Sequence, residues 1–355
     1  MGTRILRAAS AFAVTAMLDC SVPSDGRGVP ARPAPARRTT MPLEKVRYWA
    51  YQIQDLGKPG RIDALAQQQY DMLVLEPTRT DWSHPSAKAF DTRGMVERLK
   101  ASSASDAAHT KLVLAYVDVG QAESWRWYWT WAAQPPPFVV GADPDGWSDC
   151  WVVAYWSPEW RRILLGASSD RELMASAPWA SILDEVIADG FDGIYLDWVE
   201  AYDDERVIAR ARSEGRDAAQ EMIRLIGDIR SQARERVPGF VVVQQNAAPL
   251  LVGHPELLDV IDAIAQEGTW YSGEADRAWD HPRGHDIPQT GSLTSETLQA
   301  LDRFRTDGKS VFTVDYTVAN ADAVHTHARE RGYVPYCSRS ALSRLTTTPP
   351  PGLPQ

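Results

Sequence analysis

The chain has 355 residues, 44% of them apolar and 24% charged, which is enough to bury one large core and makes a globular enzyme the expected class. Its net charge is −10. Without positions 1–41, 31 basic and 45 acidic residues remain, a net charge of −14 that argues against nucleic acid or an anionic membrane as the ligand and favours a cationic one. Tryptophan outnumbers phenylalanine 14 to 7, an excess that indicates exposed aromatic surfaces such as sugar-binding clefts.

Residues 1–20 have the pattern of a secretory signal peptide. Arg4 and Arg7 precede about a dozen small or apolar residues, fewer than the ~20 that a membrane-spanning helix needs. Cys20 ends this run as the acceptor cysteine of a bacterial lipoprotein does, but Asp19 stands where that signal has a small neutral residue. We therefore expect an extracytoplasmic protein, secreted, periplasmic or lipid-anchored, whose one link to a membrane is a lipid at Cys20. A disordered start without a signal function stays open.

The segment at 21–41 is rich in Pro, Arg and Ser and is expected to be a disordered linker, and the last ten residues, TTTPPPGLPQ at 346–355, a disordered tail. One folded domain at 42–345, a monomer, lies between them. Its two cysteines, Cys150 and Cys337, either form a disulfide or remain unpaired.

Short apolar runs alternate with helical patterns along this domain, which is typical of βα units around a parallel sheet. One such helix is expected at 213–236, before Pro238 and Gly239. The pattern predicts a single (β/α)₈ TIM-type barrel. A doubly wound open sheet is the competing fold, but it usually carries a glycine-rich phosphate loop after the first strand, and the sequence has none. The expected strands are 47–54, 72–76, 112–118, 151–155, 193–197, 240–246, 263–267, 311–315 and 333–336.

Nine strands exceed the eight of a barrel. We take 333–336 as an extra C-terminal strand that pairs at the edge or caps the last helix. The connection at 119–150, after the third strand, is too long for an idle loop and contains the aromatic run SWRWYWTW. It is therefore expected to be a lid or a wall of a cleft.

Carboxylates close several of these strands. In a (β/α)₈ barrel the reacting groups lie at the carboxyl ends of the strands, and glycosidic cleavage needs two carboxyl groups, one to protonate the leaving oxygen and one to attack the sugar or activate water. Acids at one strand end are often helix caps or ion pairs, but five that meet at one face favour catalysis. These five are Glu76, Asp118, Asp197, Glu267 and Asp315.

The sequence predicts no metal or other cofactor. A metal hydrolase needs histidines clustered at strand ends, whereas His325 and His327 fall in a helical stretch and His281 and His285 in a loop. The Gly-x-Ser-x-Gly motif of many serine hydrolases is also missing from the sequence.

Four segments, VLAYVDVGQAESWRWYW, WVVAYWSPEW, GFDGIYLDWVEAY and IDAIAQEGTWY, occur in the order seen in glycoside hydrolase family 114. The chain resembles that family from about residue 47 to 336, and members are endo-α-1,4-polygalactosaminidases and related glycosidases. The resemblance implies that Asp197 and Glu267 are the catalytic carboxylates. It also implies a retaining mechanism with Asp197 as nucleophile and Glu267 as acid/base, although the two roles can be exchanged. A polysaccharide, cationic where its galactosamine is deacetylated, is then the expected partner.

One motif departs from the family. The family has Ser-Ile-Gly-Glu-Ala-Glu where this chain has Asp118-Val-Gly-Gln121-Ala-Glu123. The identity of the bound sugar therefore stays open. Two alternatives also stay open: a non-catalytic sugar-binding protein and a glycosidase for another hexose polymer. Asp118 and Glu123 either bind sugar groups or pair with Arg126. Of Trp125, Trp127, Trp129 and Trp131 we expect two in the cleft and two packed over the rim. The remaining substrate-binding candidates are Glu76, Tyr116, Tyr155, Trp156, Asn246, Trp270, Asp315 and Tyr316, and less firmly Tyr48.

Overall fold

The structure is a computed structural model that describes residues 38–77, 90–131, 134–166 and 179–354. The predicted signal peptide, Cys20 and nearly all of the predicted linker lie outside these residues. Within them, no helix combines the length and the apolar character needed to cross a membrane.

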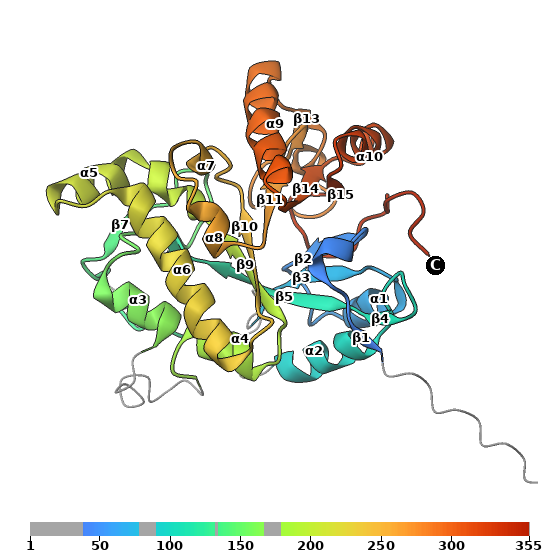
Figure 1. The fold of residues 1–355 in the computed structure, drawn as a ribbon, viewed down its shortest axis with the longest axis horizontal. Coiled ribbons are helices and arrows are strands. Elements are labelled where there is room, and N and C mark those ends of the chain that lie inside the picture. The colour runs from blue at the N-terminus through green and yellow to red at the C-terminus, as the bar shows by residue number, and fades with distance from the viewer. Residues whose placement is uncertain (1–37, 78–89, 132–133, 167–178, 355) are drawn as a thin grey trace, which may run out of the picture. The chain divides into compact units, whose positions relative to one another are not determined.

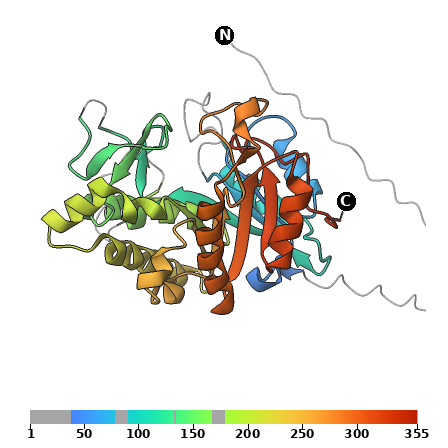
Figure 2. The ribbon, with the colours of Figure 1, turned by 90° about the horizontal axis from the view of Figure 1, so that it is seen from above.

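Eight parallel strands form one sheet that curls almost into a closed barrel with helices around its outside (Figures 1 and 2), which confirms the predicted TIM-type fold. The first and last strands meet at the seam, where the Trp49 indole N–H donates to the Val334 carbonyl at 3.0 Å. In sheet order the strands are β2 (Trp49–Gln52), β3 (Met72–Leu75), β5 (Leu112–Asp118), β9 (Gly193–Asp197), β10 (Val241–Gln245), β11 (Ala263–Glu267), β14 (Ser310–Tyr316) and β15 (Val334–Ser338).

The helices follow the strands in the expected alternation. Most of the helix expected at 213–236 is α6, and α5 ends where the expected helix was to begin. Gly215 interrupts that stretch with φ of 69°, and the Asp217 side chain caps the next helix by accepting from the Gln220 N–H. The helices are α1 (Arg61–Gln67), α2 (Thr92–Ala101), α3 (Pro158–Leu165), α4 (Ile182–Ala188), α5 (Glu205–Ser213), α6 (Ala218–Arg236), α7 (Leu250–Gly253), α8 (Leu257–Val260), α9 (Gly291–Thr306) and α10 (Ala321–Glu330), with 3-10 turns at Leu43–Lys45, Val199–Asp203 and Pro282–Gly284.

Of the nine predicted strands, the one that lies outside the barrel is β8 (Cys150–Val153). The prediction that 333–336 is the extra strand was therefore wrong. β15 pairs in parallel with β14 as the eighth barrel strand, whereas β8 lies between β6 (Gln121–Glu123) and β7 (Val139–Ala142) in a separate antiparallel sheet. A short apolar run looks the same in either sheet, because both bury it. The small sheet belongs to the long connection after the third barrel strand.

Both ends of the described domain contact the barrel. The ordered part therefore extends beyond the folded domain at 42–345 that the composition predicted. At the start, β1 (Thr39–Thr40) pairs with β4 (His109–Thr110). At the other end, where a disordered tail was expected, the Tyr48 hydroxyl donates to the Gly352 carbonyl at 2.8 Å and Leu353 is buried. A proline-rich segment offers carbonyl acceptors even where it lacks N–H donors, and the barrel's side chains use them.

Aromatic rings fill the barrel interior beneath the carboxyl ends of the strands. Trp49, Tyr51, Tyr195 and Phe312 are fully buried, and the ring centroids of Tyr51 and Tyr195 are 5.2 Å apart. Because side chains alternate along a strand, Asp197 faces the same way as Tyr195, two residues before it. The aromatic core therefore forms the floor on which the strand-end acids stand.

Candidate active site

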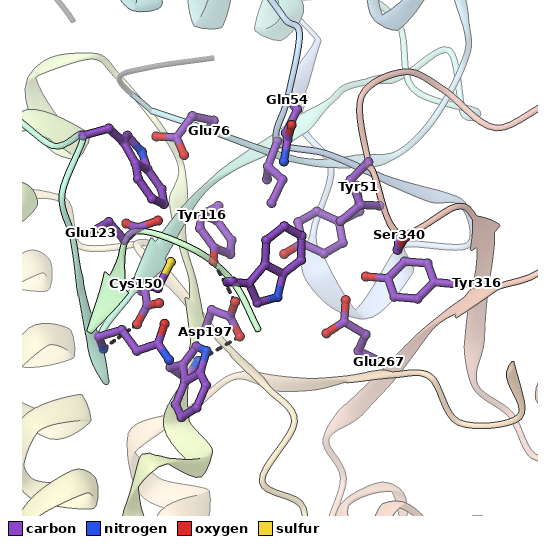
Figure 3. A pocket seen from close by; sticks show the side chains of 17 residues that line it. Tyr51, Gln54, Glu76, Tyr116, Glu123, Cys150, Asp197, Glu267, Tyr316 and Ser340 are labelled. Atoms are coloured by element: carbon purple, nitrogen blue, oxygen red, sulfur yellow. Dashed lines mark hydrogen bonds between the residues drawn. The ribbon is translucent and has the colours of Figure 1, made fainter. Parts of the chain in front are cut away.

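A pocket lies at the carboxyl ends of the barrel strands. It holds about 800 Å³, including space open to solvent. One wall comes from the small sheet, which contributes Gln121, Glu123 and Cys150, and the opposite wall includes Tyr316 and Ser340 (Figure 3). The full lining is Tyr51, Ile53, Gln54, Glu76, Tyr116, Asp118, Gln121, Glu123, Trp125, Trp147, Cys150, Asp197, Trp198, Glu267, Tyr316, Ser340 and Leu342.

Asp197, the last residue of β9, is held by three hydrogen-bond donors. Its Oδ2 accepts from the Tyr116 hydroxyl at 2.7 Å, and its Oδ1 accepts from the Trp198 N–H at 2.8 Å and from Gln245 Nε2 at 2.7 Å. Burial raises the pKa of Asp197 to about 6, and the bonds from Tyr116 and Trp198 oppose that rise. At neutral pH Asp197 is therefore largely ionised and fixed in orientation.

Glu267 ends β11 and faces Asp197 across the pocket (Figure 3). Burial raises its pKa well above the usual range, and the negative charges of Asp197 and Glu200 add to the effect. Its backbone N–H donates to Asn246 Oδ1 at 2.9 Å, which fixes the end of the strand. Burial and the neighbouring negative charges therefore favour the protonated form of Glu267.

Gln245 connects the two carboxyl groups. Its Nε2 lies 2.7 Å from Asp197 Oδ1 and 3.1 Å from Glu267 Oε2. Because both bonds end on one nitrogen, these two oxygens are at most about 5.8 Å apart, the sum of the two distances. This upper limit lies below the roughly 6.5–9.5 Å that separates the carboxyl groups of inverting glycosidases.

In a comparison with known proteins, glycoside-hydrolase family GH114 matches residues 33–350. The chain belongs to glycoside-hydrolase family GH114. This confirms the resemblance seen in the sequence motifs. An uncharacterized protein of Deinococcus radiodurans is 30% identical over 349 residues, covering 93% of this chain and 96% of the relative. Another from Methanocaldococcus jannaschii is 28% identical, covering 84% and 78%.

Two solved structures share the fold of this GH114 chain. The glycoside hydrolase domain of PelA from Pseudomonas aeruginosa has a TM-score of 0.54 at 20% identity, covering 85% of this chain and 97% of that domain. Ega3 of Aspergillus fumigatus, solved in complex with galactosamine, has a TM-score of 0.56 at 14% identity, covering 87% and 98%. At these identities the likeness establishes the barrel architecture.

Eight of the site residues predicted for this GH114 barrel lie together in the pocket. They come from the carboxyl ends of five barrel strands, β3, β5, β9, β11 and β14, and from β6 and the loop that follows it. They are Glu76, Tyr116, Asp118, Glu123, Trp125, Asp197, Glu267 and Tyr316.

Tyr155 and Trp156 were predicted to bind substrate, but the structure places them elsewhere. Tyr155 is fully buried and its hydroxyl donates to the Ala218 carbonyl at 2.6 Å, and the Trp156 indole N–H donates to Glu214 at 2.7 Å. Both follow β8, which is outside the barrel, so they tie the small sheet to the helical layer.

Three other predicted site residues support the pocket from behind. Asp315 is fully buried and accepts the backbone N–H groups of Trp270 and Tyr271 at 2.6 and 2.9 Å, so it fixes the loop after Glu267, and Trp270 packs on the core. Burial raises the pKa of Asp315 to about 7. Asn246 positions Glu267 as described above. None of the three lines the pocket. Asp315 and Asn246 accept neighbouring backbone N–H groups through a side-chain oxygen, and Asn246 Nδ2 donates to Glu200 at 2.9 Å, so their role is structural.

The acidic wall of the GH114 pocket contains a buried ion-pair network. Arg126 Nε donates to Glu123 at 2.6 Å, and its Nη2 donates to Glu76 at 3.0 Å. Glu123 therefore pairs with Arg126, whereas Asp118 accepts the N–H groups of Gly120 and Gln121 at 3.1 and 2.7 Å. Burial raises the pKa of Glu123 to about 7, and that of Asp118 also rises with burial and the nearby acids. Among the described residues no group of three or more metal-ligating side chains is arranged to hold a metal ion.

The tryptophan run divides one to three, not two to two. Trp125 lines the pocket, while Trp127, Trp129 and Trp131 pack against the core, the last two with ring centroids 4.8 Å apart. Cys150 lines the pocket as a free thiol, and Cys337 is free and buried.

Sequence reasoning missed Tyr51, Trp147, Trp198 and Gln245. Two of them carried a usable signal: Trp198 directly follows Asp197, and Gln245 is a polar residue at the end of the apolar strand β10. For the lid residue Trp147 there was no such signal, since its loop has no regular pattern.

Proposed function

We propose that this protein cleaves internal α-1,4 linkages of a galactosamine-containing polysaccharide by a retaining two-carboxylate mechanism. The observation that carries the proposal is the shared Gln245 amide, which limits the Asp197 and Glu267 oxygens to about 5.8 Å. Retaining glycosidases have carboxyl groups roughly 5–5.5 Å apart, whereas inverting enzymes need roughly 6.5–9.5 Å to admit a water molecule.

The proton states support one assignment of roles. Asp197, with a pKa of about 6 and three donors, is the nucleophile that attacks the anomeric carbon. Glu267, whose pKa is raised well above its usual range by burial and by the charge of Asp197, is the acid that protonates the leaving oxygen. In the second step Glu267 takes a proton from water as the water displaces Asp197 from the sugar.

The charge of the pocket supports an amino sugar. Five carboxyl groups line it, from Glu76, Asp118, Glu123, Asp197 and Glu267. A deacetylated galactosamine polymer is cationic and is attracted to such a surface, while the flat faces of Trp125 and Trp147 suit sugar rings. The named ligand of Ega3, galactosamine, agrees with this choice. The α-1,4 linkage and the internal cut follow from the family resemblance, and the predicted signal peptide supports a site of action outside the cytoplasm.

Release of reducing ends from deacetylated and from N-acetylated galactosamine polymers tests the proposal. We expect wild-type activity on the deacetylated polymer and a loss of at least roughly 100-fold in Asp197→Asn and in Glu267→Gln. Glu235→Gln, an exposed change on α6, is the matched control with wild-type activity. Undiminished activity in both pocket variants would sink the assignment.

Azide separates the two roles. In Glu267→Ala, azide attacks the glycosyl-enzyme and gives a glycosyl azide of retained configuration; in Asp197→Ala it replaces the nucleophile and gives the inverted product. Reversed products would exchange the roles. Binding of the polymer without product release would favour a non-catalytic sugar-binding protein, and release from galactose or glucose polymers alone would identify a glycosidase for another hexose.

A further inference from the structure

The Gln245 side chain is buried between three polar groups. Its Nε2 bonds to Asp197 and Glu267, and its Oε1 accepts from the Tyr51 hydroxyl at 3.1 Å. Gln245 and Tyr51 are 2% and 1% exposed. Since an ionised Asp197 only accepts hydrogen bonds, the amide must turn its NH₂ group towards the acids, and Tyr51 holds it in that orientation.

The position of Gln245 follows from sheet register. Gln244 is level with Leu196 of β9, so Gln245 is level with Asp197, and on the other side Gln245 pairs with Ala265, two residues before Glu267. Strand alternation turns Gln245 to the barrel interior, whereas Gln244 faces the opposite side and donates to the Asn246 carbonyl at 2.7 Å. β10 therefore places one amide between the acids of its two neighbours.

We propose that Gln245 is a positioning residue that holds Asp197 and Glu267 at the retaining distance and transmits the charge state of one carboxyl to the other. This inference rests on the proposed function. Gln245 Nε2 supplies one hydrogen to each carboxyl, and Asp197 Oδ1 already receives a second bond from the Trp198 N–H. Among the described residues Oδ2 accepts one bond, from Tyr116, and is the less occupied oxygen, so Oδ2 is the oxygen that attacks.

The amide acts differently in the two half-reactions. In the first, Asp197 Oδ2 bonds to the anomeric carbon, the glycosidic bond breaks, and the Glu267 proton moves to the departing oxygen. Asp197 is then a neutral ester and a weaker acceptor, while Glu267 is an anion and a stronger one, so the Gln245 hydrogen bond to Glu267 strengthens. In the second, a water oxygen bonds to the carbon, the ester electron pair returns to Asp197, and Glu267 takes the water proton. Donation then shifts back to Asp197.

The test compares Gln245→Leu with Gln244→Leu, the same change of a buried glutamine on the same strand but facing away from the acids. Removing the shared donor destabilises the ionised form of both carboxyls, so both limbs of the kcat pH profile should move to higher pH by roughly one unit. kcat should fall roughly 10- to 100-fold, with KM within about twofold because the amide lies beneath the substrate. Gln244→Leu should leave both limbs in place.

Tyr51→Phe is the second variant, since it keeps the amide but frees its orientation. We expect both limbs to move in the same direction by a smaller amount. Both variants are checked by thermal unfolding, so that lost folding is not taken for lost positioning. A Gln245→Leu or a Tyr51→Phe enzyme that is folded and slow but has unmoved limbs would overturn the inference.

A substrate-free measurement separates this inference from the proposed function. Carbon-13 NMR of carboxyl-labelled protein, with signals assigned through Asp197→Asn and Glu267→Gln, follows both titrations directly. If wild type releases no product from the galactosamine polymers, the proposed substrate fails, while a rise of both titrations in Gln245→Leu still supports the coupling. Unmoved titrations refute the coupling whatever the substrate.

Discussion

The hydroxyl of Tyr116 should set the acid limit of activity. It donates to Asp197 Oδ2 at 2.7 Å inside a pocket where burial raises the pKa of Asp197 to about 6. Tyr116→Phe removes this donor and leaves the ring. A hydrogen bond to a charged group is worth about 1.5–3 kcal/mol, and 1.36 kcal/mol corresponds to one pKa unit, so the pKa of Asp197 should rise by roughly one to two units.

The sign of the effect on catalysis follows from the role of Asp197. The nucleophile must be ionised, so the acid limb of kcat/KM should move from about pH 6 to about pH 7–8, while the alkaline limb, set by Glu267, stays close to its place. Activity at pH 6 should fall roughly 5- to 50-fold. This pattern differs from that of Gln245→Leu, which moves both limbs.

The stability of the protein should also depend on the ionisation of Asp197. A carboxyl whose pKa is raised in the folded state costs stability when it is ionised, above that pKa, and costs nothing below its unfolded value near 3.8. Tyr116→Phe should therefore lower the melting temperature more at pH 8 than at pH 4. Tyr155→Phe is the matched control, because it removes an equally buried hydroxyl that donates to the Ala218 carbonyl at 2.6 Å, away from the pocket. An acid limb that stays at pH 6 in folded Tyr116→Phe protein would refute the reasoning.

Two further predictions concern the walls of the pocket. Arg126→Met removes the cation that bonds to Glu123 and Glu76, so denaturant unfolding at pH 7 should show a loss of about 3–5 kcal/mol, and a smaller loss at pH 5, where Glu123, whose pKa burial raises to about 7, is protonated. Gly120→Ala puts a Cβ 2.1 Å from the Trp198 carbonyl, so it should lower kcat by displacing the backbone that holds Asp197, whereas Gly239→Ala, with open space around it, should leave kcat unchanged.

The acidic residues of the site were predictable because a sequence pattern and a general property of the barrel point to the same positions. An apolar strand that ends in a carboxylate can be seen in the sequence, and in a parallel barrel every such end meets at one face. Asp118 and Asp197 are directly paired across β5 and β9, as this rule implies. Asp315 also ends an apolar strand, but it lies three residues after the inward-facing Phe312, so strand alternation turns it away from the barrel interior and towards the backbone of Trp270 and Tyr271.

The failures have a different physical origin. Tyr155 and Trp156 end an apolar run that satisfies the strand pattern, and nothing in the run distinguishes a barrel strand from one in an antiparallel excursion. Gln245 is the opposite case, since its importance lies in bonds to residues 48 and 22 positions away, which only the register of three strands creates. Local patterns thus located the acids and could mark Gln245 as a polar strand end, but they could not show that its amide lies between Asp197 and Glu267.

The strained backbone at the pocket explains how the strands present these groups. Trp198 and Asn246, which directly follow Asp197 and Gln245, have φ of 57° and 55°, a region that costs a non-glycine residue about 1–3 kcal/mol. At Trp198 this turn directs the backbone N–H back to the Asp197 carboxylate, and at Asn246 the side chain receives the Glu267 N–H. Helical or extended angles at either position would relieve the strain but redirect these donors and acceptors. The strain is therefore retained because it orients the carboxyls, and the stability it removes is offset by the buried barrel beneath.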